Sequence, residues 1–318
     1  MSSPTNICVL GGTGFVGTEL VTRLARAGHW VRVPSRNPGR GQHLQVLPTV
    51  ELVAADVHDP RALGRVLEGM DAVVNLVGIL NESGRATFQS VHAELAAKLV
   101  YATRAARVSR LLQMSAVGAD AERGPSRYLR SKGAAEAHIR AAAELLQFTI
   151  FRPSVIFGPG DSLGNRFASL LRLSGGFIPL ARARARFAPV YVGDVAEAFV
   201  RALRDKETFG RSYELCGPEV VTLERIVRLT ASAAQLPCHI LALPDVLGRL
   251  QGALLGLVPG KPFSLDNFRS LTVDSVCAEN GCARLGLTPR HMMAVLPFYL
   301  GPYTAAAEFD AHRKSNDG

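Results

Sequence analysis

The chain has 318 residues, of which 47% are hydrophobic and 20% charged, as in soluble globular proteins with a sizeable core. Its net charge of +9 comes from scattered basic residues without interleaved aromatics, so nucleic-acid binding is not expected. A polyanionic ligand or an anionic membrane surface suits this charge better. No apolar run is long enough to span a bilayer, and the first strand begins by Asn6, which leaves no room for a signal peptide. We expect a cytoplasmic protein and leave peripheral contact at the inner face of the membrane open.

The cysteine and histidine residues indicate neither a disulfide framework nor a metal site. The five cysteines are odd in number and show no CxxC spacing: Cys8, Cys216, Cys238, Cys277 and Cys282. We therefore expect reduced thiols, as in a cytoplasmic protein. The eight histidines form no HxxxH or HxH pair, so no bound metal is expected.

Strand-like and helix-like segments alternate along the first part of the chain. Short apolar runs rich in β-branched residues predict five strands, at residues 6–10, 29–35, 50–57, 71–79 and 110–118. Helical patterns lie between most of these runs. Strands separated by helices predict an α/β fold with a doubly wound parallel sheet of the Rossmann type.

A glycine-rich segment, "GGTGFVG", directly follows the first strand and opens a helix. Its seven residues are Gly11, Gly12, Thr13, Gly14, Phe15, Val16 and Gly17. Glycines let the backbone turn tightly and approach a pyrophosphate, and the helix N-terminus offers unpaired N–H groups and a positive dipole end. This context between a strand and a helix favours dinucleotide binding over a tight turn without a ligand.

The end of the second strand indicates which dinucleotide is bound. An NAD site normally places an acidic residue there, but this chain has no acid between Glu19 and Glu51. It carries Ser35, Arg36 and Arg40 instead, which suit a 2′-phosphate through charge-assisted hydrogen bonds. NADP(H) is therefore favoured over NAD(H). The alternative is that Arg36 is simply a solvated loop arginine.

The domain organisation follows from these patterns. Residues 1–155 are expected to form an NAD(P)-binding Rossmann domain, to which residues 187–210 return. The pattern changes from about residue 156, so 156–186 and 211–310 are assigned to a smaller, mostly C-terminal substrate-binding region. The polar residues 311–318 are expected to form a frayed tail.

Several motifs in order resemble the short-chain dehydrogenase/reductase superfamily, in its extended or atypical, NAD-dependent epimerase/dehydratase-like branch. They are "GGTGFVG", "AADVHDP" (54–60), "NLVG" (75–78), "YLRSK" (128–132), "FRPSVIFGPGD" (151–161), "PVYVGDVAEAFVRAL" (189–203) and "YELCGPE" (213–219). The resemblance covers residues 6 to 219. Beyond the glycine segment and Arg36, it implies cofactor contacts from Ser35, Asp56, Val57, Leu76, Val77, Gly78, Met114, Tyr128, Lys132, Pro153 and Val155.

Within that superfamily, "NLVGILNE", "VHAEL" and "YLRSK" are similar to the group that contains the Rossmann-type accessory subunit of respiratory complex I and its free-standing bacterial relatives. Mitochondrial members of the group hold NADPH tightly and are regarded as structural. The resemblance therefore implies cofactor binding more strongly than it implies turnover.

The motif "YLRSK" resembles the superfamily's Tyr-x-x-x-Lys signature. The resemblance implies that Tyr128 is the general acid/base and that Lys132, one turn along the same helix, lowers the phenol pKa and holds the nicotinamide ribose. Ser115 is the candidate for the substrate-orienting hydroxyl, although that role aligns equally with Ala116 or Val117. His92 stands where the superfamily usually has a proton-relay Asn. It either carries a proton or is a helix residue bonded to nearby backbone.

The C-terminal part contains a further helix pattern at residues 244–262. Val246, Leu247, Leu250, Leu254 and Leu257 fall on one stripe of it. The default interpretation is a helix packed on the core. The alternative is an apolar lid or membrane-facing helix, which would suit a lipophilic substrate.

Three functions are carried forward. The first is an NADP(H)-dependent oxidoreductase acting on a lipophilic carbonyl or quinone-like substrate. The second is a non-catalytic NADPH-bound assembly or stability factor for a respiratory complex or a quinone-biosynthetic enzyme. The third is a nucleotide-sugar epimerase or dehydratase. Contact with a membrane or a respiratory complex, the oligomeric state and the substrate are left open.

Overall fold

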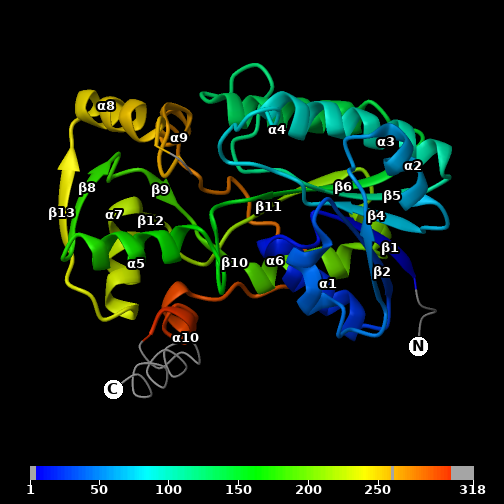
Figure 1. Cartoon of the computed structure of the whole chain (residues 1–318), viewed down its shortest axis with the longest axis horizontal. Helices are drawn as coiled ribbons and strands as arrows, with labels where there is room; N and C mark the ends of the chain where they lie inside the picture. The colour runs from blue at the N-terminus through cyan, green and yellow to red at the C-terminus, as the bar shows by residue number, and fades with distance from the viewer. Residues whose placement is uncertain (1–4, 259–260, 302–318) are drawn as a thin grey trace.

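A seven-stranded parallel sheet forms the centre of the molecule (Figure 1). The structure, a computed structural model, describes residues 5–258 and 261–301. The expected tail at 311–318 lies outside the described residues. The strand order is β11-β6-β5-β4-β1-β2-β3. The chain builds the sheet outward in one direction from β1 to β3 and in the other from β4 to β11, as in a doubly wound fold. The strands are β1 Asn6–Leu10, β2 Trp30–Ser35, β3 Val50–Ala54, β4 Ala72–Asn75, β5 Arg110–Met114, β6 Gln147–Pro153 and β11 Arg211–Leu215. The Rossmann-type fold class expected from the sequence is confirmed.

Helices cover both faces of this sheet because its strands are apolar on both sides. On one face lie α1 Phe15–Arg26 and α6 Val192–Ala202, and on the other lie α2 Pro60–Leu67, α3 Leu95–Ala105 and α4 Arg127–Arg140 (Figure 1). Within β1, Ile7 and Val9 pack toward α1 and α6, whereas Cys8 and Leu10 pack toward α2 and α3. One continuous apolar run is thereby shared between two hydrophobic cores.

A smaller layer of short sheets and helices lies beyond the edge of the main sheet. Its strands pair two by two: β7 Ile156–Phe157 with β10 Val190–Tyr191, β9 Arg186–Phe187 with β12 Val221–Thr222, and β8 Phe177–Ala181 with β13 His239–Leu243. Its helices are α5 Leu163–Leu173, α7 Leu223–Ala233, α8 Asp245–Leu255, α9 Leu265–Ser270 and α10 Pro297–Leu300. Short 3₁₀ turns at Pro38–Leu44, Lys206–Thr208 and Met292–Ala294 complete the described elements, with a π-helical turn at Gln89–Glu94 that continues into α3.

The main sheet takes in one strand that was expected in the smaller region. Residues 211–215, assigned to the C-terminal region, form β11 and pair in parallel with β6 at the sheet edge. The segment 187–210 supplies α6, which packs beside α1. We retain the division into a dinucleotide-binding domain and a substrate-binding region as a proposal, with β11 moved to the former.

The leucine-rich helix α8 does not pack its leucines on the core. Leu247, Leu250 and Leu254 are exposed, whereas Gly248 and Gly252 are buried. The default expectation for residues 244–262 is therefore wrong. The reason is that the small glycine face lets α8 approach β8 and α9 closely, which turns the leucine face outward. Within the part of the chain that the structure describes, no helix is long and apolar enough to cross a bilayer.

The expectation that every cysteine is a free thiol is also wrong. Cys216, directly after β11, and Cys277 form a disulfide, although they lie 61 residues apart in the sequence. Cys8, Cys238 and Cys282 are free. The bond joins the end of the main sheet to the segment that follows α9, and no local spacing motif marks a pair that only the tertiary structure brings together.

The disulfide predicts a thiol count. Alkylation of the denatured protein without reductant should modify the three free cysteines, and prior reduction should add the remaining two. Intact-mass spectrometry measures both numbers. Five modified cysteines in the unreduced sample would contradict the bond.

Candidate active site

The glycine segment forms a tight turn between β1 and α1. Gly11 has a positive φ of 78°, a conformation that favours glycine, and its carbonyl accepts a hydrogen bond from the Gly14 N–H at 3.0 Å. A Cβ on Gly17 would lie 2.2 Å from the Gly11 oxygen, so only glycine allows α1 to start this close to the turn. The sequence therefore brings a helix N-terminus directly to the end of β1.

That N-terminus has the properties of an anion site. Gly14 caps α1 without a side-chain hydrogen bond, and the first turn of the helix carries no acidic residue. The N–H groups of the first turn and the positive end of the helix dipole are thus left for a ligand. These features fit the pyrophosphate of a dinucleotide.

The residues expected around the adenosine half lie at the ends of neighbouring strands. Arg36 follows β2 and is exposed, and the Ser35 hydroxyl accepts a hydrogen bond from the Asn37 N–H at 3.2 Å. Asp56 and Val57 follow β3, where the Asp56 carboxylate accepts from the His58 N–H at 3.0 Å. Because parallel strands end at one edge of the sheet, these side chains share the edge that carries the glycine turn.

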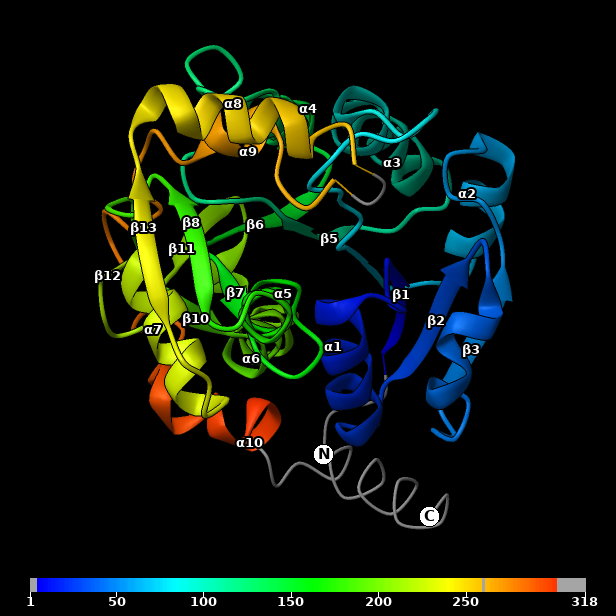
Figure 2. The same ribbon diagram turned by 60° about the vertical axis from the view of Figure 1, so that its left-hand side comes forward.

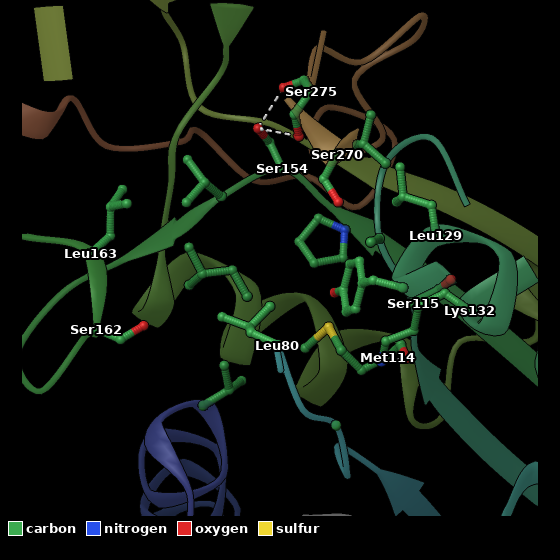
Figure 3. Close-up of a pocket in the computed structure, with 18 of the residues that line it drawn as sticks. Leu80, Met114, Ser115, Leu129, Lys132, Ser154, Ser162, Leu163, Ser270 and Ser275 are labelled. Carbon is green, nitrogen blue, oxygen red and sulfur yellow. Dashed lines mark hydrogen bonds between the residues drawn. The ribbon is translucent and has the colours of Figure 1, made fainter. Parts of the chain in front are cut away.

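A cavity of about 480 Å³ begins at this turn and extends into the smaller region (Figure 3). Most of its accessible lining is apolar. Its lining includes these expected site residues: Gly11, Gly14, Phe15, Val16, Gly17, Leu76, Gly78, Met114, Ser115, Tyr128, Lys132, Pro153 and Val155. The expected residues outside its lining are Gly12, Thr13, Ser35, Arg36, Asp56, Val57 and Val77. The structure thus brings the glycine turn and the Tyr-x-x-x-Lys pair to one cavity.

The C-terminal region supplies lining residues that no sequence motif indicated. Ser270, Leu271, Val273 and Ser275 line the cavity, and the Ser154 hydroxyl donates to the Ser275 carbonyl at 2.6 Å (Figure 3). Residues 270–275 lie more than 130 residues after Tyr128 in the sequence, so their position in the same cavity follows only from the fold.

The helix that carries Tyr128 and Lys132, α4, is held at its N-terminus by the C-terminal region. The Asp266 carboxylate, on α9, accepts hydrogen bonds from the backbone N–H groups of Arg127 at 2.8 Å and Tyr128 at 3.0 Å. Ser126 caps Leu129 N–H at 3.1 Å, and the Ser270 hydroxyl donates to the Ser126 hydroxyl at 2.8 Å. The negative charge of Asp266 at this end of the helix also interacts favourably with the positive end of the helix dipole. Asp266 therefore fixes where Tyr128 stands.

Burial shifts the pKa values of both members of the pair. Desolvation raises the pKa of the Tyr128 phenol to about 12. Desolvation also lowers the pKa of Lys132 to about 8, against a smaller opposing effect of the Glu136 charge. The Lys132 ammonium is buried and donates to the Met114 carbonyl at 3.3 Å. In the protein without cofactor, the tyrosine thus holds its proton firmly near neutral pH.

The hydroxyl of Ser115 is directed to a buried carboxylate. It donates to Glu136 Oε1 at 2.6 Å, and Arg152 binds the same carboxylate through Nε at 2.8 Å and Nη2 at 2.6 Å. A serine hydroxyl has one proton to donate. In this arrangement Ser115 can accept a hydrogen bond from a substrate hydroxyl but has no proton left for a substrate carbonyl.

His92 is a positioning residue in this structure. Its Nε2 accepts a hydrogen bond from the Ile79 N–H at 3.1 Å, and its Nδ1 lies 2.8 Å from the Ser131 hydroxyl, which itself donates to the Tyr128 carbonyl at 2.7 Å. Nδ1 must therefore carry the ring proton. Burial and the Lys132 charge lower the pKa of His92 to about 2, so the ring stays neutral. Of the two interpretations of His92, the geometry agrees with the one bonded to backbone.

A Rossmann sheet, a glycine turn under a helix N-terminus and a Tyr-x-x-x-Lys helix together define an NAD(P)-binding protein of the short-chain dehydrogenase/reductase type. The model of the NAD dependent epimerase/dehydratase family matches residues 7–216, and the chain belongs to this family. No group of three or more His, Cys, Asp or Glu that could hold a metal ion occurs within residues 5–258 and 261–301.

Individual relatives fall into more than one functional group. The mitochondrial NADH dehydrogenase (ubiquinone) 1 alpha subcomplex subunit 9 of Arabidopsis thaliana is 32% identical over 288 residues, which are 86% of this chain and 71% of that protein. The ceramide reductase of Caulobacter vibrioides is 32% identical over 198 residues, 62% of this chain and 61% of that protein. The Thermus thermophilus UDP-glucose 4-epimerase in complex with NAD has a similar fold, with a TM-score of 0.64 and 22% identity over 83% of this chain and 99% of that one. The resemblance to the extended branch and to the complex I subunit is confirmed.

The buried lysine predicts a stability gain on its removal. The pKa of Lys132 falls from an ordinary 10.5 to about 8 on folding, so near pH 7 the folded state bears the cost of a buried charge. We expect Lys132→Met to stabilise the cofactor-free protein by up to about 3 kcal/mol at pH 7, because one pKa unit corresponds to about 1.4 kcal/mol. The stability of the wild type should rise between pH 8 and 10.5, where the folded state releases the proton first.

Chemical unfolding of both proteins between pH 7 and pH 10.5 measures this difference. The exposed Lys206→Met serves as the matched control and should leave the free energy of unfolding unchanged. If the Lys132→Met protein is less stable than the wild type at pH 7, the buried charge of Lys132 does not destabilise the folded state.

Proposed function

We propose that this chain is an NADP(H)-dependent oxidoreductase that reduces a lipophilic carbonyl or quinone-like substrate. The observation that carries the proposal is the placement of Tyr128 and Lys132 on the wall of a largely apolar cavity that begins at the glycine turn. Most of the lining beside them is aliphatic, with Ile79, Leu80 and Val155 among the residues. The ceramide reductase relative, which acts on a lipid by its name, supports this substrate class.

The roles of the residues follow from their environment. The phenol of Tyr128, with a pKa raised to about 12 by burial, is protonated at neutral pH and donates its proton to the substrate oxygen. Lys132 remains a cation below about pH 8; it stabilises the tyrosinate left behind and binds the ribose. The bound nicotinamide supplies the hydride that completes reduction of the carbonyl carbon.

The preference for NADP(H) rests on the end of β2. Arg36 is exposed at the end of β2, on the sheet edge that carries the glycine turn, and its guanidinium can bind a 2′-phosphate. No acidic residue follows β2 to accept a hydrogen bond from a ribose hydroxyl. The other arginine of the segment, Arg40, is exposed as well. We further propose peripheral contact with a membrane or a respiratory complex. The expected cytoplasmic location rested in part on reduced thiols, and the Cys216–Cys277 disulfide removes that support.

A second candidate is an NADPH-bound assembly or stability factor without turnover. The identity to a complex I subunit supports it. So does Ser115, because its only proton is donated to Glu136 and not to a substrate. The third candidate, a nucleotide-sugar epimerase or dehydratase, is less supported. Among the described residues that line the cavity, Lys132 is the only one with a cationic side chain, so they contain no second basic cluster for a nucleotide diphosphate.

The cofactor preference gives a direct prediction. We expect Arg36→Ala to weaken NADPH binding by about 10- to 100-fold, because charge-assisted hydrogen bonds are worth roughly 1.5–3 kcal/mol. NADH binding should stay unchanged. Titration calorimetry measures both. Arg26→Ala, at the far end of α1, is the matched control. Equal affinity of the wild type for NADPH and NADH refutes the preference.

The phenol gives a second prediction. We expect Tyr128→Phe to lower NADPH oxidation with 2-decanone or decylubiquinone by roughly 10²- to 10⁴-fold, because it removes the general acid. The dissociation constant for NADPH should change little. The exposed Tyr101→Phe is the control. If the wild type oxidises NADPH with neither acceptor, and Tyr128→Phe still supports the cellular role, the assembly factor replaces the enzyme as the better proposal.

A further inference from the structure

An apolar stripe runs along the outer side of α8. Six aliphatic side chains make up this surface, the α8 apolar face, and are between 44% and 84% exposed: Val246, Leu247, Leu250, Leu254, Leu257 and Val258. They recur every three to four residues, so they share one side of the helix and its C-terminal extension. In Figure 2, α8 lies on the periphery of the molecule above α9. A helix of a water-soluble domain normally turns this side inward.

The opposite side of α8 explains its orientation. A Cβ on Gly248 would come within 2.9 Å of the Phe268 ring and 3.0 Å of the Ala181 Cβ, and one on Gly252 within 3.1 Å of the Ser264 oxygen. The glycines therefore permit a close approach that a larger residue would disturb, at Gly248 more than at Gly252. Because the small residues of α8 face the protein, its leucines face outward, and this orientation is set by the packing of the helix.

The apolar surface continues beyond the helix. β13 and β8 pair in parallel, with Leu241 opposite Pro179. Phe177, Pro179 and Ala181 alternate onto one face of this ribbon, and Ala181 lies beneath Gly248, so this is the face that α8 covers in part. Leu241 and Phe177 are each about two-thirds exposed. They enlarge the α8 apolar face along the same side of the molecule.

The charges around this surface favour an anionic partner. No acidic residue occurs from position 246 to position 265, where Arg249 and Lys261 are the charged residues. Asp245, at the first position of the helix, is neutralised by an ion pair of 3.1 Å with Arg182. Basic groups beside an aliphatic face are the pattern of helices that lie in the headgroup region of an anionic bilayer.

The α8 apolar face is joined to the mouth of the cavity. The Asn81 side chain donates to the Lys261 carbonyl at 3.1 Å, the Lys261 ammonium to the Glu82 carbonyl at 2.6 Å, and the Asn267 side chain to the Leu80 carbonyl at 3.2 Å. Leu80 lines the cavity and is itself 56% exposed. The segment after α8 is thus fastened to the loop that borders the site.

We propose that the α8 apolar face docks the protein on an anionic phospholipid surface and turns the Leu80 edge of the cavity toward the bilayer. At 11 residues, or about 16 Å, α8 lies in the surface and does not cross it. A protein partner fits less well, because the surface is mainly leucine and valine, with Phe177 at its margin, whereas the anchors of protein interfaces are enriched in aromatic residues and arginine. The docking itself is independent of turnover; only the entry of a lipid substrate at Leu80 rests on the proposed function.

Flotation of the full chain with vesicles tests the docking. The vesicles are phosphatidylcholine alone, or phosphatidylcholine with phosphatidylglycerol at about 3:1. We expect binding to the anionic vesicles that weakens with added salt, and at least about tenfold weaker binding for Leu250→Gln combined with Leu254→Gln. The matched control is Leu145→Gln with Val46→Gln, two exposed apolar residues distant from α8 in the sequence, and it should bind as the wild type does.

Each other outcome overturns the proposal. These are absence of flotation, equal flotation of the α8 variant and the wild type, binding only to native membranes that retain their proteins, and a dimer in solution that the α8 variant dissociates. Since Leu250 and Leu254 lie outside the cavity lining, NADPH binding and reduction of a water-soluble aldehyde should be the same in the α8 variant. Failure of docking therefore leaves the proposed function standing, and failure of turnover leaves the docking standing.

Discussion

The carboxylate of Glu136 is the group on which the arrangement of the site depends. It is buried in α4 and receives the bidentate guanidinium of Arg152 from β6, the Ser115 hydroxyl from the end of β5 and a longer contact from Arg140 at 3.4 Å. A buried charge that loses its partners is strongly destabilising, so these bonds fix α4 against the two strands. Tyr128 and Lys132 take their positions over the sheet edge from this attachment.

The same helix is held at its other end by a residue from the smaller region. Asp266 binds the first N–H groups of α4, so the orientation of Tyr128 depends on both parts of the chain. The cavity is therefore a product of their contact, with the glycine turn from one part and Ser270 and Ser275 from the other. Its two ends differ in character, since one offers backbone N–H groups to an anion and the other offers aliphatic side chains.

Glycine has two uses in this chain, and the sequence reveals only one of them. At Gly11 and Gly17 the sequence predicted a tight turn between a strand and a helix, and the structure has this turn between β1 and α1. Dinucleotide binding at the turn stays a prediction. At Gly248 and Gly252 no sequence motif marks the glycines, and they form the buried side of α8. A period of 3.6 residues shows which side chains share a face; it does not show which face meets the protein.

The sequence by itself determined the order of strands and helices, the parallel sheet, the glycine turn and the Tyr128–Lys132 spacing, because each depends on residues close together along the chain. The tertiary structure decided everything that requires distant segments to meet. It joined Cys216 to Cys277, brought the Asp266 carboxylate to the N-terminus of α4, placed β11 in the main sheet and directed the Ser115 hydroxyl to Glu136 as a hydrogen-bond donor. These contacts span from 21 to 139 residues, and no local pattern of residue types encodes them.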